Sequence, residues 1–188
     1  MKSILRIFAL SLLVMLFSCE QDTINDDSNL DRKPKQEDGC ETAYAYGKED
    51  EAICFLNDPD LTSNKWGWSI GPLTATHTQS YIIYQAAGQC NTDNGQEIGT
   101  LYVHYESNYV LVDFVANDGY GFFETHVYVG NQKFPTKRNG QFTVAPGQYP
   151  FSHDLPDGVS VDSYKIDDVE GPIYVIAHAV VCPYKKVD

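Results

Sequence analysis

The stretch GPIYVIAHAVVC, residues 171–182, decides the fold class of this 188-residue chain. Ile, Val and Ala occupy odd and even positions alike, so both faces of an extended segment would be apolar. This pattern is typical of a central strand buried on both sides, because a strand at the surface alternates apolar with polar residues. We therefore predict a central β-strand over residues 171–182.

Several segments before this stretch also have strand patterns and are bounded by turn residues. They are ETAYAYG (41–47), TLYVHY (100–105), YVLVDFVA (109–116) and GFFETHVYVGN (121–131). In the last of them, alternation places Phe123, Thr125, Val127 and Val129 on one face. No convincing helical period follows residue 40, so we predict one all-β domain over residues 40–188. Its expected architecture is an antiparallel β-sandwich, immunoglobulin-like or jelly-roll-like.

Four of the five cysteines lie in this domain, at Cys40, Cys54, Cys90 and Cys182. An even number in an exported domain favours disulfides, and four cysteines allow three pairings. We favour Cys40 with Cys182, because these two bracket the domain, which leaves Cys54 to pair with Cys90. A zinc site would need close pairs such as C-x-x-C, and the sequence has none.

The fifth cysteine, Cys19, follows a cationic start and an apolar run over residues 7–17. This layout is typical of a secretory signal that is too short to span a bilayer. The stretch LFSC, residues 16–19, resembles the lipobox of bacterial lipoproteins, although Phe17 is bulkier than the usual residue there. The resemblance implies that residues 1–18 are a signal peptide and that Cys19 is acylated. Two or three acyl chains would anchor the protein stably in a membrane.

Residues 20–39 carry seven acidic and three basic residues and almost no large apolar side chains. Together with Cys19 they are predicted to be a flexible tether. An acidic segment directly after the lipidated cysteine resembles the surface-export signals of Bacteroidetes lipoproteins. We therefore expect an outer-membrane or cell-surface location. The domain itself has nineteen acidic residues against eight Lys and Arg, a net charge of −11, which disfavours nucleic acid as a partner.

Five motifs within the domain resemble an uncharacterised secreted domain of Bacteroidetes surface proteins and some fungal secreted proteins. They are CETAYAYG (40–47), KWGWS (65–69), ETHVYVGN (124–131), APGQYP (145–150) and YVIAHAVVC (174–182). The resemblance covers nearly the whole domain. It implies a cell-surface location and no particular chemistry.

Two tryptophans, Trp66 and Trp68, flank Gly67 in one of these motifs and would share one side of a strand. Exposed indoles form platforms on which sugar rings stack, and Tyr44 and Tyr46 could extend such a platform. The alternative is that the tryptophans anchor the sandwich core, since each buries a large apolar surface. These four aromatic residues are the predicted ligand-binding surface.

Three residues could converge on a metal ion if their strands are neighbours, namely Glu124, His126 and His178. The alternative is a structural polar network, because a histidine within a strand often serves as a hydrogen-bonding partner. Calcium is a second possible cation, since residues 57–60 (NDPD) and 91–97 (NTDNGQE) are rich in oxygen ligands. Neither segment matches the twelve-residue calcium loop, and Asx turns explain the same residues. No other cofactor is expected.

The sequence contains no G-x-S-x-G, H-E-x-x-H, phosphate-binding or dinucleotide-binding motif. We therefore expect a binding or adhesion module for a glycan or an envelope protein, rather than an enzyme. One alternative is a hydrolase of polysaccharides with a carboxylate pair such as Asp113 and Glu124. The other is a structural accessory subunit of an envelope complex.

Overall fold

The computed structural model describes residues 39–48 and 50–184, which belong to one compact unit. Ten strands make up most of it, and the helical segments are three 3-10 turns, η1 (Gly88–Cys90), η2 (Thr92–Asn94) and η3 (Pro146–Gln148). The strands are β1 (Glu41–Tyr46), β2 (Ala52–Cys54), β3 (Trp68–Leu73), β4 (His77–Gln85), β5 (Gln96–Tyr105), β6 (Tyr109–Ala116), β7 (Tyr120–Gly130), β8 (Phe151–Val159), β9 (Val161–Asp167) and β10 (Ile173–Pro183). Within the described residues, no helix is long and apolar enough to cross a membrane.

Strand β10 is the centre of the sheet, as the apolar pattern of residues 171–182 predicted. One edge of β10 pairs with β7 along almost its whole length. Its other edge pairs with β3 near the start of β10 and with β1 near the end. From β1 the sheet continues through β4, β5 and β6 to β9, while β8 pairs with β7 and β2 with β3. All of these pairings are antiparallel.

The sheet folds over on itself, so that two layers enclose the main core. Phe114 of β6 packs edge-on against Phe122 of β7, with 5.6 Å between the ring centroids. Tyr164 of β9 donates a hydrogen bond to the carbonyl oxygen of Thr125 in β7. These contacts join strands that are not neighbours in the sheet, which confirms the predicted disulfide-stapled β-sandwich.

One face of β7 differs from the prediction because its register with β8 shifts between Phe122 and Glu124. A register shift of this kind changes which side chains point inward. Phe122 is therefore fully buried in the main core together with Val127, whereas Phe123 is half-buried and packs against Tyr184.

Both predicted disulfides are present. Cys40 bonds to Cys182 across 142 residues and ties the segment before β1 to the end of β10. Cys54 bonds to Cys90 and joins β2 to the segment that follows β4. The predicted signal peptide (1–18), the lipidation site Cys19 and nearly all of the tether (19–39) lie outside the described residues, so these remain predictions.

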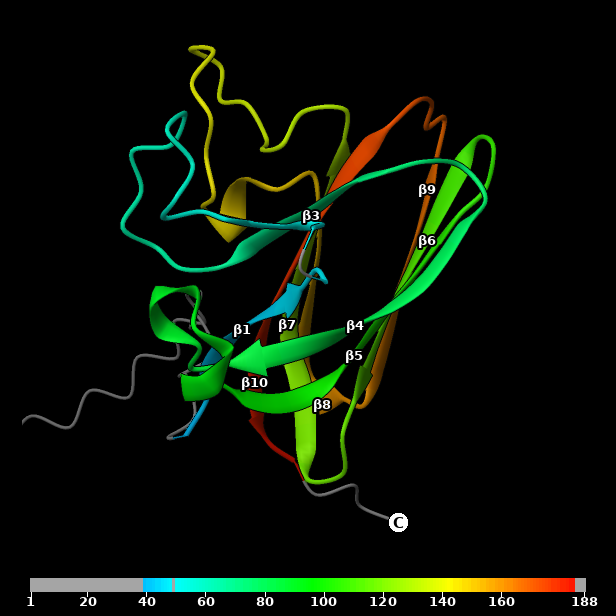
Figure 1. The fold of residues 1–188 in the computed structure, drawn as a ribbon. Coiled ribbons are helices and arrows are strands. Elements are labelled where there is room, and N and C mark those ends of the chain that lie inside the picture. Colours follow the sequence, from blue (N-terminus) through cyan, green and yellow to red (C-terminus); the bar gives the residue numbers. More distant parts are fainter. Residues whose placement is uncertain (1–38, 49, 185–188) are drawn as a thin grey trace, which may run out of the picture. The chain divides into compact units, whose positions relative to one another are not determined.

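A second core lies on the outer face of β1, β10 and β7. Two long segments cover it, residues 55–67 after β2 and residues 131–150 after β7. In Figure 1 they appear in cyan and yellow and lie together beside β3. The buried residues of this second core are Tyr44, Phe55, Trp68, Ala87, Tyr128, Phe134, Val144, Tyr149 and Ile176.

Candidate binding site

An unbroken series of aromatic contacts crosses the outer face of β1 and β3. Tyr44 lies edge-on to Trp66 at 5.3 Å, and Trp66 lies edge-on to Trp68 at 5.7 Å. Trp68 in turn meets Tyr46 at 5.0 Å between ring centroids. The four aromatic residues that the sequence singled out therefore contact one another, in the edge-to-face arrangement that aromatic pairs prefer.

The burial of these residues decides which of them a ligand could touch. Trp68 and Tyr44 are each only 2 % exposed, whereas Trp66 and Tyr46 are partly exposed. The four residues thus do not form one open platform, because two of them are core residues. The Phe55 ring lies close against Gly67, between the two tryptophans. Only Trp66 and Tyr46 remain accessible from outside.

Tyr46 also lines a pocket of about 590 Å³ where β1 ends, which we call the Glu51 pocket. Its lining residues are Tyr46, Lys48, Asp50, Glu51 and Gln79. Tyr46 comes from the end of β1 and Gln79 from β4, and the other three come from the connection between β1 and β2. The pocket thus combines an aromatic ring with an amide, an ammonium and two carboxyl groups. Its volume falls in the range of small-ligand sites.

A series of hydrogen bonds connects His77 and Tyr81 of β4 to the Glu51 carboxylate. The Tyr81 hydroxyl donates to Glu51 Oε2 at 3.0 Å and lies 2.9 Å from His77 Nε2. The rings of His77 and Tyr81 are stacked, with 13° between their planes. Burial raises the pKa of Tyr81 well above its usual value, and the hydrogen bond to Glu51 and its charge raise it further. Tyr81 therefore remains a hydrogen-bond donor at any physiological pH.

The two histidines proposed as metal ligands do meet. His178 and His126 are directly opposite in the pairing of β10 with β7, and their ring centroids are 5.2 Å apart. Glu124 Oε2 lies 3.3 Å from His126 Nε2. However, no group of three or more His, Cys, Asp or Glu in residues 39–48 and 50–184 could hold a metal ion. Glu124, His126 and His178 therefore do not form the three-ligand site suggested by the sequence.

The environment of His178 explains this result. The side chain is buried against Tyr44, at 4.8 Å between ring centroids, and against His126. Burial, together with the nearby charges of His126 and Lys65, lowers the pKa of His178 to about 3. The imidazole is thus a neutral member of the second core.

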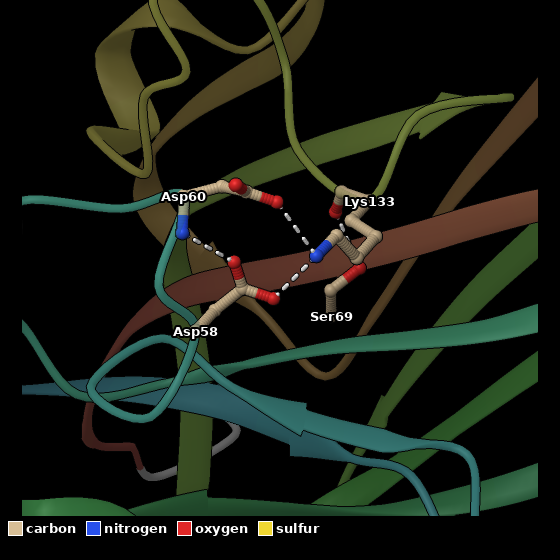
Figure 2. Close-up of polar contacts among 4 residues, drawn as sticks. All are labelled: Asp58, Asp60, Ser69 and Lys133. Carbon is tan, nitrogen blue, oxygen red and sulfur yellow. Dashed lines mark hydrogen bonds and ion pairs between the residues drawn. The ribbon is translucent and has the colours of Figure 1, made fainter.

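The carboxylates of the oxygen-rich segment 57–60 are paired with a lysine side chain of the same protein. Lys133 Nζ lies 2.6 Å from Asp58 Oδ2 and 3.1 Å from Asp60 Oδ2. Figure 2 shows the ammonium between the two carboxylates, while Ser69 donates to the Lys133 carbonyl oxygen at 2.7 Å. The two carboxylates are therefore paired with the Lys133 ammonium, and this cluster joins the two segments that cover the second core.

The second oxygen-rich segment, residues 91–97, is used in turns and side-chain contacts. Asn91 Oδ1 accepts from the Asp93 backbone N–H, an Asx turn that caps η2. Glu97 Oε1 accepts from the Tyr84 hydroxyl at 3.2 Å. The Asx turn, which the sequence suggested as the alternative to a calcium site, therefore accounts for residues at the start of this segment.

The carboxylate pair suggested for a hydrolase is far from convergent. Asp113 lies on β6 between core residues Val112 and Phe114, so its side chain points away from the main core. Glu124 points away from that core on the opposite layer, beside His126. A single substrate could not contact both side chains.

Of the residues that line the Glu51 pocket, only Tyr46 was predicted from the sequence. Gln79 could have been identified from the sequence, because alternation in residues 77–83 places His77 and Gln79 on the same strand face as Tyr81 and Ile83. Polar residues at the start of a buried face mark the rim of a core. No sequence pattern pointed to Glu51, since its role depends on a contact with Tyr81, thirty residues later in the chain.

Comparison with known proteins gave no relative: no protein-family model, no curated protein and no solved structure matches the chain.

Proposed function

We propose that the chain is a lipid-anchored lipoprotein of a bacterial outer membrane or cell surface, and that its β-sandwich binds a glycan in the Glu51 pocket. The sequence supports the anchor through the signal-like N-terminus and LFSC at residues 16–19. The pocket supports glycan binding. The membrane is a partner only through the acyl chains, and the acidic domain does not favour nucleic acid.

The observation that carries the binding function is the composition of the Glu51 pocket. Sugar rings present C–H groups that pack on an aromatic face, and Tyr46 provides such a face. Sugar hydroxyls form hydrogen bonds: the amide of Gln79 can donate or accept them, and the carboxylates of Asp50 and Glu51 can accept them. Trp68, a residue of the second core, packs edge-on against the Tyr46 ring and so holds that ring in place.

Hydrolysis of a polysaccharide is the competing function, because Asp50 and Glu51 bring two carboxyl groups to one pocket. Glycosidases use such a pair, one as general acid and the other as base or nucleophile. Release of reducing ends from a bound glycan, and its loss in both Asp50→Asn and Glu51→Gln, would show that the chain is an enzyme.

The binding test uses the full chain, displayed on cells or held in detergent, against an array of bacterial and plant glycans. We expect Tyr46→Ala and Gln79→Ala each to weaken binding, since each removes one pocket contact. Tyr102→Ala is the matched control, because Tyr102 is a tyrosine 48 % exposed on β5 and is not among the residues that line the pocket. Unchanged binding by a folded Tyr46→Ala variant would contradict the proposal.

A separate test addresses the anchor. Mass spectrometry of the mature protein should find acyl chains at Cys19, and Cys19→Ser should release the protein from the membrane fraction. A mature form that retains residues 1–18 or carries no acyl group would contradict the proposed location.

A further inference from the structure

We infer that Glu51 is the residue that selects the ligand, that Tyr81 positions it, and that the pocket takes glycans presenting hydroxyl or ammonium donors in preference to glycans with carboxylates. This inference rests on the proposed glycan-binding function. The underlying observation is the hydrogen-bonded series from His77 through Tyr81 to Glu51.

The direction of each hydrogen bond in this series follows from chemistry. An ionised carboxylate only accepts, so the single Tyr81 hydroxyl proton is donated to Glu51 Oε2. The Tyr81 oxygen must then accept from His77 Nε2–H. That nitrogen can carry its proton whether the imidazole is neutral or charged. The series therefore runs in one direction, from His77 through Tyr81 to Glu51.

This arrangement fixes the Glu51 carboxylate at the pocket wall. One of its oxygens is held by a hydroxyl that burial keeps protonated, which orients the whole group. A carboxylate has about four acceptor positions, so Glu51 can still accept from a ligand. A fixed acceptor recognises a donor better than a mobile one, because no side-chain freedom is lost when the ligand binds.

The charges around the pocket set the class of ligand. Asp50 and Glu51 are opposed by the single ammonium of Lys48 among the described lining residues. The whole chain has a net charge of −13, so its long-range field also repels anions. A carboxylate-bearing glycan would place like charges together, whereas hydroxyl and ammonium groups would meet acceptors.

The test compares three soluble probes by calorimetry with the full chain: chitohexaose, which is neutral, a chitosan hexamer, which carries ammonium groups, and oligogalacturonate, which carries carboxylates. We expect the two donor-presenting probes to bind at least about tenfold more tightly than oligogalacturonate. Glu51→Gln should reduce this preference to a few-fold, because it removes the charge and keeps the shape.

Tyr81→Phe separates positioning from folding, because it keeps the buried ring and removes only the hydroxyl. We expect several-fold weaker binding of the preferred probe and a smaller preference over oligogalacturonate. Tyr128→Phe is the matched control, since Tyr128 lies on β7 and its hydroxyl donates to the Gln132 carbonyl oxygen instead of to a pocket residue. It should leave the preference unchanged.

The outcomes are distinguishable. Equal or tighter binding of oligogalacturonate, or a preference that survives both Glu51→Gln and Tyr81→Phe, would overturn this inference while glycan binding itself stands. Failure of the unaltered chain to bind any of the array glycans would overturn the proposed function.

Discussion

His178 shows how one residue can be set by its surroundings. It lies at the middle of β10, 5 % exposed, with Tyr44 opposite it on β1 and His126 opposite it on β7. The Nδ1 atoms of both His178 and His126 are buried and have no hydrogen-bond partner in the structure. Leaving such atoms unpaired costs stability. A charge added here would cost more, which is why the His178 pKa lies so far below the usual value.

This burial predicts that the protein loses stability as the pH falls. The pKa of His178 is about 3 in the folded state and about 6.5 when unfolded. Above pH 6.5 both states are neutral, whereas below it only the unfolded state takes up the proton. The free energy of unfolding therefore falls with decreasing pH until about pH 3, by up to about 1.4 kcal/mol per pH unit.

The measurement is the urea midpoint at pH 7 and at pH 5, for the unaltered chain and for His178→Phe. The variant keeps a planar ring and cannot titrate, so its midpoint should fall less between the two pH values. An equal fall in both proteins would contradict the assigned role of His178.

A second prediction concerns Lys133. Lys133→Met should lower the free energy of unfolding by about 1 kcal/mol, because the Asp58 carboxylate, 6 % exposed, loses its cation. Lys165→Met is the matched control, since Lys165 and its partner Asp167 are both well exposed and such pairs contribute little. Chemical unfolding of the two variants at pH 7 measures the contrast. Equal effects would mean that Lys133 contributes no more than a surface pair.

At the scale of the elements, the segment between β2 and β3 decides the shape of the aromatic cluster. Gly67 has a φ of +139°, in a region that favours glycine, and a Cβ there would lie 2.5 Å from the Phe55 ring. The backbone therefore passes directly over Phe55 and Tyr44, which brings Trp66 and Trp68 onto the same side.

Gly67→Ala should therefore destabilise the fold by about 1–3 kcal/mol, because the methyl group clashes with a buried ring and the backbone is strained. Gly147→Ala is the control, since a Cβ at Gly147 meets nothing within 4 Å and its φ is ordinary. Thermal unfolding gives the difference, and Trp fluorescence reports whether the indoles move. Equal stability of the two variants would contradict the packing described for Gly67.

At the scale of the whole molecule, covalent bonds tie together segments that are distant in sequence. The Cys40–Cys182 bond closes a loop of 142 residues, whereas Cys54–Cys90 closes one of 36. A disulfide reduces the entropy of the unfolded chain more when its loop is longer. In that account the first bond contributes about 5 kcal/mol and the second about 4 kcal/mol.

We expect Cys40→Ser with Cys182→Ser to lower the free energy of unfolding by more than Cys54→Ser with Cys90→Ser, by about 1 kcal/mol. Urea unfolding of the two double variants under oxidising conditions measures the difference. A larger loss from the short loop would show that local packing around Trp66 and Gly67, rather than chain entropy, dominates its contribution.

Some features of the molecule follow from local patterns alone. The all-β class and the central position of β10 follow from apolar residues on both faces of residues 171–182, because such a strand is stable only when covered on both sides. The disulfide pairing followed from the positions of Cys40 and Cys182 at the two ends of the domain. Each of these depends on residues close in sequence or on chain ends.

Other features depend on where distant segments meet. The register shift that buries Phe122 occurs in the pairing of β7 with both β8 and β10, and the burial of Trp68 and Tyr44 depends on covering segments that begin after β2 and β7. Local alternation shows which residues share a face, and it does not show what covers that face.

The sequence by itself therefore determined the all-β class, the segments that became β1, β5, β6, β7 and β10, and the bonded cysteines, while the address at Cys19 stays a prediction. Only the tertiary structure decided that the Asp58 and Asp60 carboxylates hold Lys133, that His178 is buried as a neutral imidazole, and that Glu51 meets Tyr81 at a pocket. The physical reason is that burial and hydrogen bonding between distant side chains arise only when the sheet closes on itself.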